Sequence, residues 1–189
     1  MKLETRKDQI IRTSEILFKE KGYSAVTMRD IAKAMGIKAA SLYNHISSKQ
    51  EILANIIISL AEEFTNGMVV IMSSESSSVE KLNHIIELHV SITSNNAYGM
   101  ASLNNDWMHL KAEQDYYLKL RLDYEENFRQ IIQEGINNNE LKNTNAEVML
   151  FSVLSTLRSL YIWIPNKDDL NSSSLAADLS RVLLTGIIK

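Results

Sequence analysis

Residues 24–51 read SAVTMRDIAKAMGIKAASLYNHISSKQE and hold the side chains of this chain that are best suited to reading a DNA duplex. The guanidinium group of Arg29 has a forked donor geometry that matches the O6 and N7 acceptors of guanine. The Asn44 amide can pair with adenine, and Ala39 and Ala40 offer apolar contact to thymine methyl groups. Such contacts require short helices that present these residues to a groove, so the surrounding elements decide the interpretation.

Local signals place two short helices and a turn in this stretch. Thr27 and Asp30 have the spacing of a capping box, in which each side chain bonds the other residue's backbone N–H group. Gly36 follows the first short helix, where a left-handed turn residue costs least. The pattern predicts a helix-turn-helix, whose second helix fits the DNA major groove. The apolar face of the first short helix is formed by Ile31, Ala32 and Met35.

A third helix is expected to begin directly after the motif. Ser48 and Glu51 have capping-box spacing and predict that a longer helix begins at Lys49. We therefore expect a DNA-binding domain over residues 1–48 and a second domain over residues 49–189. The residues expected to anchor the second short helix on the first are Ile37, Ala40 and Leu42.

The charge distribution supports this division. Residues 1–50 hold ten Lys and Arg against five Asp and Glu, a net charge of +5. Residues 51–189 hold ten Lys and Arg against eighteen Asp and Glu, a net charge of −8. A basic module on an acidic body is expected if only the module meets phosphates, although chance clustering of surface charge is the alternative.

The remainder of the chain reads as helical. One proline and six glycines in 189 residues permit long helices, and no alternating strand pattern is present. The sequence predicts an all-α fold of about nine helices, with the helix-turn-helix domain followed by a helical ligand-binding and dimerisation domain. Beyond the motif, helices are expected near residues 7–21, 49–72, 79–93, 100–110, 113–137, 145–163 and 172–189. The first of these has Thr5 and Asp8 at capping-box spacing before it and can end at Gly22. The buried side of the helix over residues 79–93 is expected to be Leu82, Ile85, Ile86, His89 and Val90.

Composition argues against several classes of function. There is no cysteine, no Gly-rich phosphate loop and no HExxH pair, so we expect neither an enzyme nor a cofactor. His84 and His89 lie five residues apart and share no helix face, so no metal site is expected. The first ten residues lack a signal-peptide core, and Arg158 interrupts the most apolar run, residues 148–164. We therefore expect a cytoplasmic protein without a membrane span.

The last two helices are expected to form a homodimer interface. The helix over residues 145–163 is apolar on more than one face and needs cover on several sides. A second apolar stripe follows in residues 175–187. Pairing both helices with those of a second copy would make a four-helix bundle with a two-fold axis. The alternative is that both helices are internal core of a monomer.

Residues 10–53 resemble the DNA-binding region of the tetracycline-repressor (TetR) family. The resemblance lies in the set LFKEKGY, T-x-x-x-I-A-x-x-x-G, LY-x-H and SKQEIL, and covers about a quarter of the chain. Thr13 and Ser14 replace the alanine pair usual in the family's first helix, and Ile46 replaces an aromatic residue. The replacements are small or apolar, so we expect adjusted packing and retained DNA binding.

The resemblance implies roles for individual residues. Tyr43, His45 and Lys49 are expected to meet phosphates, and Thr27 either joins them or serves as a cap only. Arg29 either reads a base or holds a phosphate. Base reading is expected from Arg29, Lys38, Ala39, Ala40, Ser41 and Asn44.

An effector site is expected among the later helices, lined by adaptable methionine and aromatic side chains and two arginines. For each of these residues, filling the core is the alternative role. Arg158 lies in an apolar helix and either binds an acidic ligand group or pairs with a carboxylate, within the chain or across a dimer. The candidates are Met68, Met72, His89, Met100, Trp107, Met108, Tyr117, Arg121, Phe128, Met149, Arg158 and Trp163.

Two effector chemistries remain open. The segment YYLKLRLDYEENFRQIIQEGI resembles that of family members that sense acyl-CoA or related lipids. A cationic amphipath held near Glu113, Asp115 or Glu125 is the competing hypothesis. The sequence thus predicts a ligand-responsive, dimeric DNA-binding repressor. The alternatives are an activator of the same architecture and a helix-turn-helix protein that acts through a protein partner.

Overall fold

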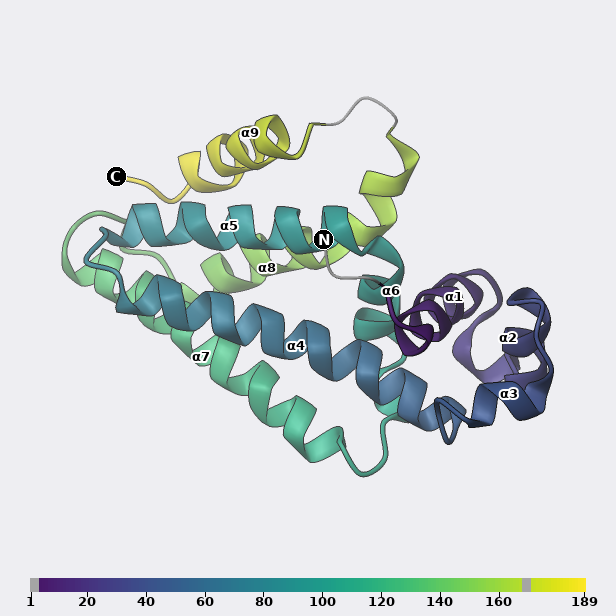
Figure 1. The fold of residues 1–189 in the computed structure, drawn as a ribbon. Helices are drawn as coiled ribbons and strands as arrows, with labels where there is room; N and C mark the ends of the chain where they lie inside the picture. Colours follow the sequence, from purple (N-terminus) through teal and green to yellow (C-terminus); the bar gives the residue numbers. More distant parts are fainter. Residues whose placement is uncertain (1–3, 168–170) are drawn as a thin grey trace. The chain divides into compact units, whose positions relative to one another are not determined.

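The computed structural model describes residues 4–167 and 171–189, and these residues form nine α-helices without a β-sheet. The predicted all-α class is confirmed. Three short 3-10 turns, Tyr23–Ala25, Trp107–His109 and Ile164–Asn166, lie between the helices. The helices are α1 (Arg6–Lys21), α2 (Met28–Ala34), α3 (Ala39–Tyr43), α4 (Lys49–Ser73), α5 (Ser78–Asn95), α6 (Ala97–Asn105), α7 (Gln114–Asn137), α8 (Ala146–Trp163) and α9 (Ser172–Thr185) (Figure 1).

The chain divides into two compact units. The first contains the described residues up to Ala61 together with Tyr98–Tyr117, and the second contains Glu62–Ala97 and Leu118–Lys189. Helix α4 is continuous and contributes to both units. The first unit therefore includes α6 and the 3-10 turn after it, in addition to the expected helix-turn-helix. The domain boundary expected between residues 48 and 49 stays a prediction.

Capping and turn chemistry build the first unit as the sequence predicts. Thr27 Oγ1 accepts a hydrogen bond from the Asp30 N–H at 3.2 Å, and the Asp30 carboxylate accepts one from the Thr27 N–H at 2.9 Å. Thr5 and Asp8 form the same box at the start of α1. Gly22 and Gly36 have φ angles of 82° and 65°, the left-handed region that favours glycine at helix ends.

Two local expectations in the first unit need correction. Ala40 is exposed, so α3 is anchored by Leu42 and by Ile46, which follows it. At the start of α4 only one of the two hydrogen bonds of the expected capping box forms. It runs from the Glu51 N–H group to Ser48 Oγ, at 3.0 Å. The Glu51 carboxylate instead accepts hydrogen bonds from the backbone and hydroxyl of Ser47, at 2.8 and 2.7 Å.

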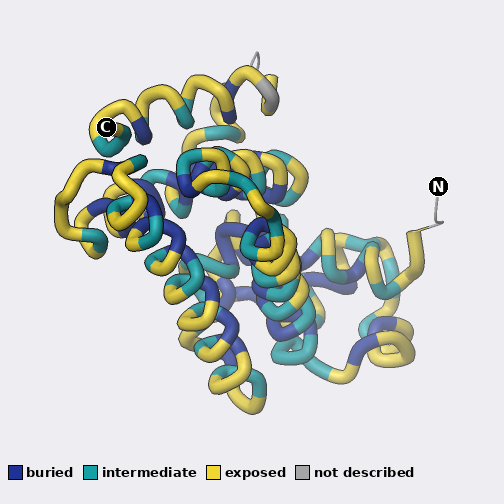
Figure 2. Tube along the Cα trace, turned by 90° about the vertical axis from the view of Figure 1, so that its left-hand side faces the viewer, coloured by how far each residue is buried: buried dark blue, intermediate teal, exposed yellow. Residues whose placement is uncertain are grey.

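The second unit is organised around α5, which packs against α8 and α9 (Figure 1). Its buried stripe is the predicted one, Leu82, Ile85, Ile86, His89 and Val90. Ser77 and Glu80 form an unpredicted capping box that starts α5. Figure 2 shows that α9 is exposed along most of its length.

The ends of two elements differ from the expectations. The segment expected as one helix over residues 100–110 is α6 followed by the Trp107–His109 turn, because Asn105 and Asp106 favour turn conformations. The last helix ends at Thr185 and does not reach the C-terminus. There the backbone pairs with residues 140–142, since the Lys142 N–H donates to the Ile187 carbonyl at 2.7 Å.

Two helices are long and apolar enough to cross a membrane by length and composition alone. They are Lys49–Ser73, which is α4, and residues 146–166, which include α8; both have windows with a mean hydropathy of 1.4. The expectation that no run meets this standard was therefore wrong. The core helices of a soluble protein pass the same test, and α4 buries Ile52, Leu53, Ile56 and Ile57 almost completely.

Candidate functional site

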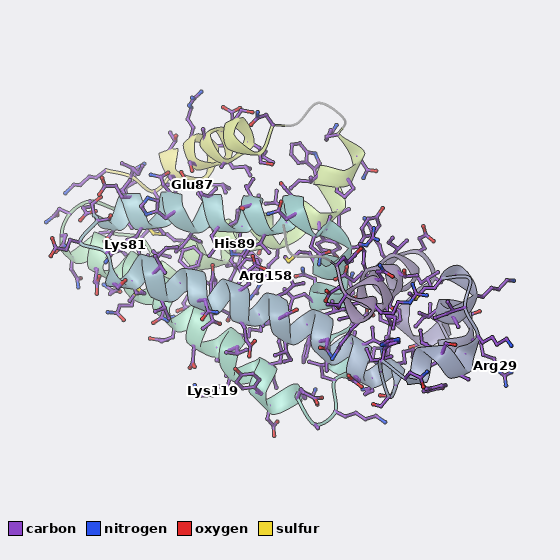
Figure 3. The ribbon with its side chains drawn as sticks, in the orientation of Figure 1. Arg29, Lys81, Glu87, His89, Lys119 and Arg158 are labelled. Atoms are coloured by element: carbon purple, nitrogen blue, oxygen red, sulfur yellow. The ribbon has the colours of Figure 1, made fainter. Side chains whose placement is uncertain are left out.

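The predicted DNA-reading residues lie on a short surface formed by α2, α3 and the residues directly before and after α3. Leu42 and Ile46 are almost fully buried, and they anchor this surface on the rest of the protein. Arg29 projects from the first turn of α2 into solvent (Figure 3). Ala39 is half-buried, and the other base-reading candidates, Arg29, Lys38, Ala40, Ser41 and Asn44, are exposed.

Two of the three residues expected at phosphates are also accessible. The Tyr43 side chain is 54% exposed, although a large aromatic residue is usually more buried, and His45 is exposed beside it. Thr27 is exposed, and its hydroxyl donates to the Asp30 carboxylate at 2.6 Å. The hydrogen bonds from Thr27 hold the pKa of Asp30 below its ordinary value. Thr27 therefore serves as a cap in this structure.

Lys49 is placed differently from the other predicted contacts. Its ammonium group donates to the carbonyl oxygens of Tyr23 and Val26, each at 2.7 Å, and lies 4.3 Å from the centre of the Tyr23 ring. Burial lowers the pKa of Lys49, and the charge of Asp106 acts in the opposite direction. A phosphate contact would require this ammonium group to leave the carbonyl groups that it now binds.

The twelve ligand candidates are distributed over both compact units. In the first unit, Met100 and Tyr117 are buried, Trp107 is half-buried and Met108 is exposed. In the second unit, Trp163 is exposed. The half-buried candidates there are Met72, Arg121 and Arg158, and the buried ones are Met68, His89, Phe128 and Met149.

His89 on α5 is one of the buried polar residues of the second unit, together with Ser78 and Thr93 (Figure 3). Its Nε2 atom lies 2.9 Å from the Tyr124 hydroxyl, and its ring lies 4.6 Å from that of Phe64. Burial, with the nearby charge of Arg158, lowers the pKa of His89 to about 3. Burial also raises the pKa of Tyr124 above its ordinary value. Both groups are therefore uncharged at neutral pH.

Two buried polar atoms on the same side of α5 have no hydrogen-bond partner within the protein. They are His89 Nδ1 and the hydroxyl oxygen of Thr93, one helical turn further on. An unpartnered buried polar atom is costly, so such atoms indicate a binding site or an internal water. Thr93 was missed by the sequence analysis, although its i+4 spacing from His89 could have identified it.

Arg158 pairs with a carboxylate within its own chain. Its Nη2 atom lies 2.5 Å from Glu125 Oε1, and Arg121 Nε lies 3.1 Å from the same oxygen. Burial raises the pKa of Glu125, but the hydrogen bonds from Arg158 and Arg121 outweigh it, so the pKa lies below its ordinary value. Arg158 is thus engaged in an ion pair within its own chain.

A separate groove of about 360 Å³ lies between α5 and α9. None of the predicted ligand residues lines it. Among the described residues, no group of three His, Asp or Glu could hold a metal ion. The groove is lined by Glu87, Val90, Ser91, Ser94, Asn95, Ser172 and Ala176.

Comparison with known proteins identifies both halves of the chain. The family described as "Bacterial regulatory proteins, tetR family" matches residues 10–56, and "Tetracyclin repressor-like, C-terminal domain" matches residues 75–187. Over 76 residues the chain is 37% identical to IcaR, the negative transcriptional regulator of the biofilm operon icaADBC in Staphylococcus aureus (strain N315), covering 40% of this chain and 41% of IcaR. Over 78 residues it is 30% identical to the transcriptional repressor KstR2 of Mycolicibacterium smegmatis, covering 41% and 38%. The chain thus spans about two fifths of these relatives.

Solved structures share the fold over nearly the whole chain. The ketosteroid transcriptional regulator KstR2 of Mycobacterium tuberculosis has a TM-score of 0.93 at 18% identity, covering 100% of this chain and 97% of that one. PfmR from Thermus thermophilus has a TM-score of 0.82 at 25% identity, covering 94% and 98%. AibR, solved with isovaleryl coenzyme A and operator DNA, has a TM-score of 0.79 at 18% identity, covering 94% and 97%. The matched relatives are transcriptional regulators and not enzymes.

Proposed function

Given that this chain belongs to the tetracycline-repressor (TetR) family of bacterial regulatory proteins, we propose that it is a homodimeric repressor that a small molecule releases from its operator. The observation that carries the proposal is the exposed polar surface of α2 and α3 above the buried Leu42 and Ile46. Members of this family are soluble DNA-binding proteins, and we place this protein in the cytoplasm.

In the proposed DNA complex, Tyr43 and His45 contact phosphates and Thr27 caps α2 close to them. Arg29 supplies the strongest base-specific group, because its fork can bind guanine O6 and N7 together. The net charge of +5 in residues 1–50 supplies the non-specific attraction to the duplex. The remaining base contacts are assigned to Lys38, Ala39, Ala40, Ser41 and Asn44.

The proposed dimer forms through α8 and α9. Helix α8 exposes Val148, Phe151 and Ile162, and α9 exposes Val182. Both helices pack against α5, and such exposed apolar side chains are typical of a surface that a second copy covers. Two copies then present two reading surfaces to successive major grooves on one face of the duplex.

The proposed effector is a small apolar or amphipathic molecule whose buried part contains an uncharged hydrogen-bonding group. Among the described residues of the second unit, His89 Nδ1 and the Thr93 hydroxyl are the buried polar side-chain atoms that lack a hydrogen-bond partner, and neither residue is charged. The cationic side chain nearby, Arg158, already bonds Glu125. An acyl-CoA thioester and a drug-like amphipath both contain such uncharged groups, so both chemistries remain candidates. Binding that favours a dimer state unsuited to the operator releases DNA by population shift.

The proposal is tested by a gel shift on the DNA that flanks the protein's own gene. We expect retention of at least one fragment, and we expect salt to weaken it steeply because phosphate contacts release counterions. If none of the flanking fragments is retained in a salt-sensitive way, the alternative of a protein partner is favoured. A reporter driven by the retained fragment separates repression from activation, since deletion of the regulator raises expression only if it represses.

A further inference from the structure

The ammonium group of Lys49 binds the chain segment that leads into the DNA-reading helices. Lys49 is the first residue of α4, yet its Nζ atom donates to the carbonyl oxygens of Tyr23 and Val26 at 2.7 Å. A longer contact of 3.4 Å reaches the carbonyl oxygen of Ser24. The three donors of a lysine ammonium group are therefore all directed at one short backbone segment.

This segment has a particular need for a cation. The 3-10 turn Tyr23–Ala25 ends with carbonyl groups that its own N–H groups do not reach, and its C-terminal end has partial negative charge. Val26 then adopts an extended conformation, and its carbonyl oxygen accepts from the same ammonium group. A single ammonium group satisfies carbonyl oxygens on both sides of this change in conformation.

The Tyr23 ring forms the other side of the ammonium site. The ring centre lies 4.3 Å from Lys49 Nζ, within range of a cation–π interaction. The edge of Phe18 and the stacked ring of His109 hold Tyr23, at centroid distances of 5.1 and 5.2 Å. Its hydroxyl donates to Gln50, the neighbour of Lys49 in α4. Lys49 therefore reaches a rigid acceptor site within the first compact unit.

The bound segment leads directly to the residues that read DNA. Val26 precedes Thr27, which caps α2, and Arg29 lies in the first turn of that helix. We propose that Lys49 is a positioning residue, whose ammonium group fixes the segment 23–26 and thereby the start of α2, and that it makes no phosphate contact. This inference rests on the proposed DNA-binding function and replaces the phosphate role that the family resemblance implies for Lys49.

The salt dependence of DNA binding tests this inference. Lys49→Met and the control Lys38→Met each remove one positive charge, but Lys38 is exposed at the start of α3. Binding of each variant to a fluorescein-labelled duplex of random sequence is measured by anisotropy between about 50 and 200 mM KCl. The measurements are made at low temperature, with circular dichroism confirming that each variant is folded.

We expect Lys49→Met to weaken binding by about tenfold, the order expected for losing charge-assisted hydrogen bonds that hold the reading surface. The slope of log affinity against log salt should equal that of the wild type, because no phosphate contact is lost. Lys38→Met should reduce this slope by about 0.9 per protomer, because on a duplex of random sequence the exposed Lys38 ammonium group meets a phosphate in place of its preferred base. Lys49→Arg, which keeps the charge and the donors, should restore most of the affinity. Hydrogen exchange of the amides of residues 24–27 should accelerate in Lys49→Met only.

Three results would overturn the inference. A slope reduced in Lys49→Met as much as in Lys38→Met assigns Lys49 to a phosphate. An unchanged affinity with a lower melting temperature leaves Lys49 a role in stability alone. If the wild-type protein binds no duplex, the proposed DNA-binding function itself is contradicted. This result can be distinguished from the other two. If Lys49→Met does not fold, Lys49→Gln, which retains a donor but no charge, is judged by the same criteria.

Discussion

At the scale of single residues, the reading surface separates two kinds of DNA contact. Arg29 offers a fork that distinguishes guanine from the other bases, whereas the Tyr43 hydroxyl offers one donor suited to any phosphate. Both side chains are exposed and contribute little to the core. Changes at either residue should therefore alter DNA binding with little effect on stability.

We expect Tyr43→Phe to weaken binding about equally on all sequences, since it removes a contact to a DNA phosphate. Arg29→Ala should relax the preference at one position of the site, at a cost of about 1–3 kcal/mol on the preferred sequence. Selection of binding sites from a random library, followed by titration of single-base variants, measures both effects. A Tyr43→Phe defect confined to one base would contradict this division of roles.

The buried His89 makes stability depend on pH. Its pKa in the folded protein is about 3, against 6.5 as an ordinary value. Below pH 6.5 the unfolded chain binds a proton at this residue and the folded protein does not, so acid favours unfolding. We expect His89 to reduce the free energy of unfolding by about 1.4 kcal/mol per pH unit as the pH falls from 6.5 towards 3.

Urea unfolding of the wild type and of His89→Gln at about pH 7.5, 6 and 5, at one protein concentration, isolates this contribution. Glutamine keeps hydrogen-bonding capacity and does not titrate. The stability of the wild type relative to the variant should fall progressively across these pH values. A constant difference between the two proteins would show that His89 does not titrate as described.

At the scale of elements, the start of α2 combines a folding role and a proposed binding role. Thr27 caps α2 with the same geometry that Thr5 uses at α1. Loss of either cap should cost about 1 kcal/mol of stability. Only Thr27 belongs to the proposed DNA surface, so Thr5 provides a matched control for capping alone.

We expect Thr27→Ala and Thr5→Ala to lower thermal stability by similar amounts, while Thr27→Ala alone reduces DNA affinity at temperatures where both variants are folded. Thr27→Ser, which preserves the cap, should retain both properties. Calorimetry and anisotropy titrations provide the two measurements. Equal loss of DNA affinity in the two alanine variants would contradict the proposal that the start of α2 takes part in DNA binding.

At the scale of the whole molecule, the exposed apolar residues of α8 and α9 indicate association. Phe151 is 70% exposed and Val182 is 74% exposed, which is a high exposure for large apolar side chains. In the proposed dimer both become buried. The dimer would have twice the mass of the 21.5 kDa chain.

Phe151→Glu combined with Val182→Glu should convert the protein to monomers in sedimentation-velocity experiments, because each protomer would bring two carboxylates into the apolar interface. Leu122→Glu on α7, where Leu122 is 64% exposed, is the control and should leave the dimer intact. Dissociation should also lower affinity for a two-half-site operator much more than affinity for a single half-site. A monomeric wild type would contradict the proposed assembly.

The sequence predicted those features that depend on neighbouring residues. The boxes of Thr5 with Asp8 and of Thr27 with Asp30, the left-handed Gly36 and the buried stripe of α5 all formed as expected. Each depends on spacings of a few residues, which helical geometry converts directly into contacts. The choice between Ser47 and Ser48 as partner of the Glu51 carboxylate was not predictable, because both lie within reach of one flexible side chain.

The sequence by itself determined that the chain is helical, that a cationic helix-turn-helix lies near its N-terminus and that the family is that of TetR, because period, capping and charge are local properties. Only the tertiary structure decided what the long polar side chains bind. In that structure Lys49 bonds carbonyl groups in residues 23–26 and Arg158 bonds Glu125. His89 and Thr93 each have a buried polar atom without a hydrogen-bond partner. The physical reason is that a long, flexible side chain can reach several partners, and only the packing of distant segments places one of them within hydrogen-bonding distance.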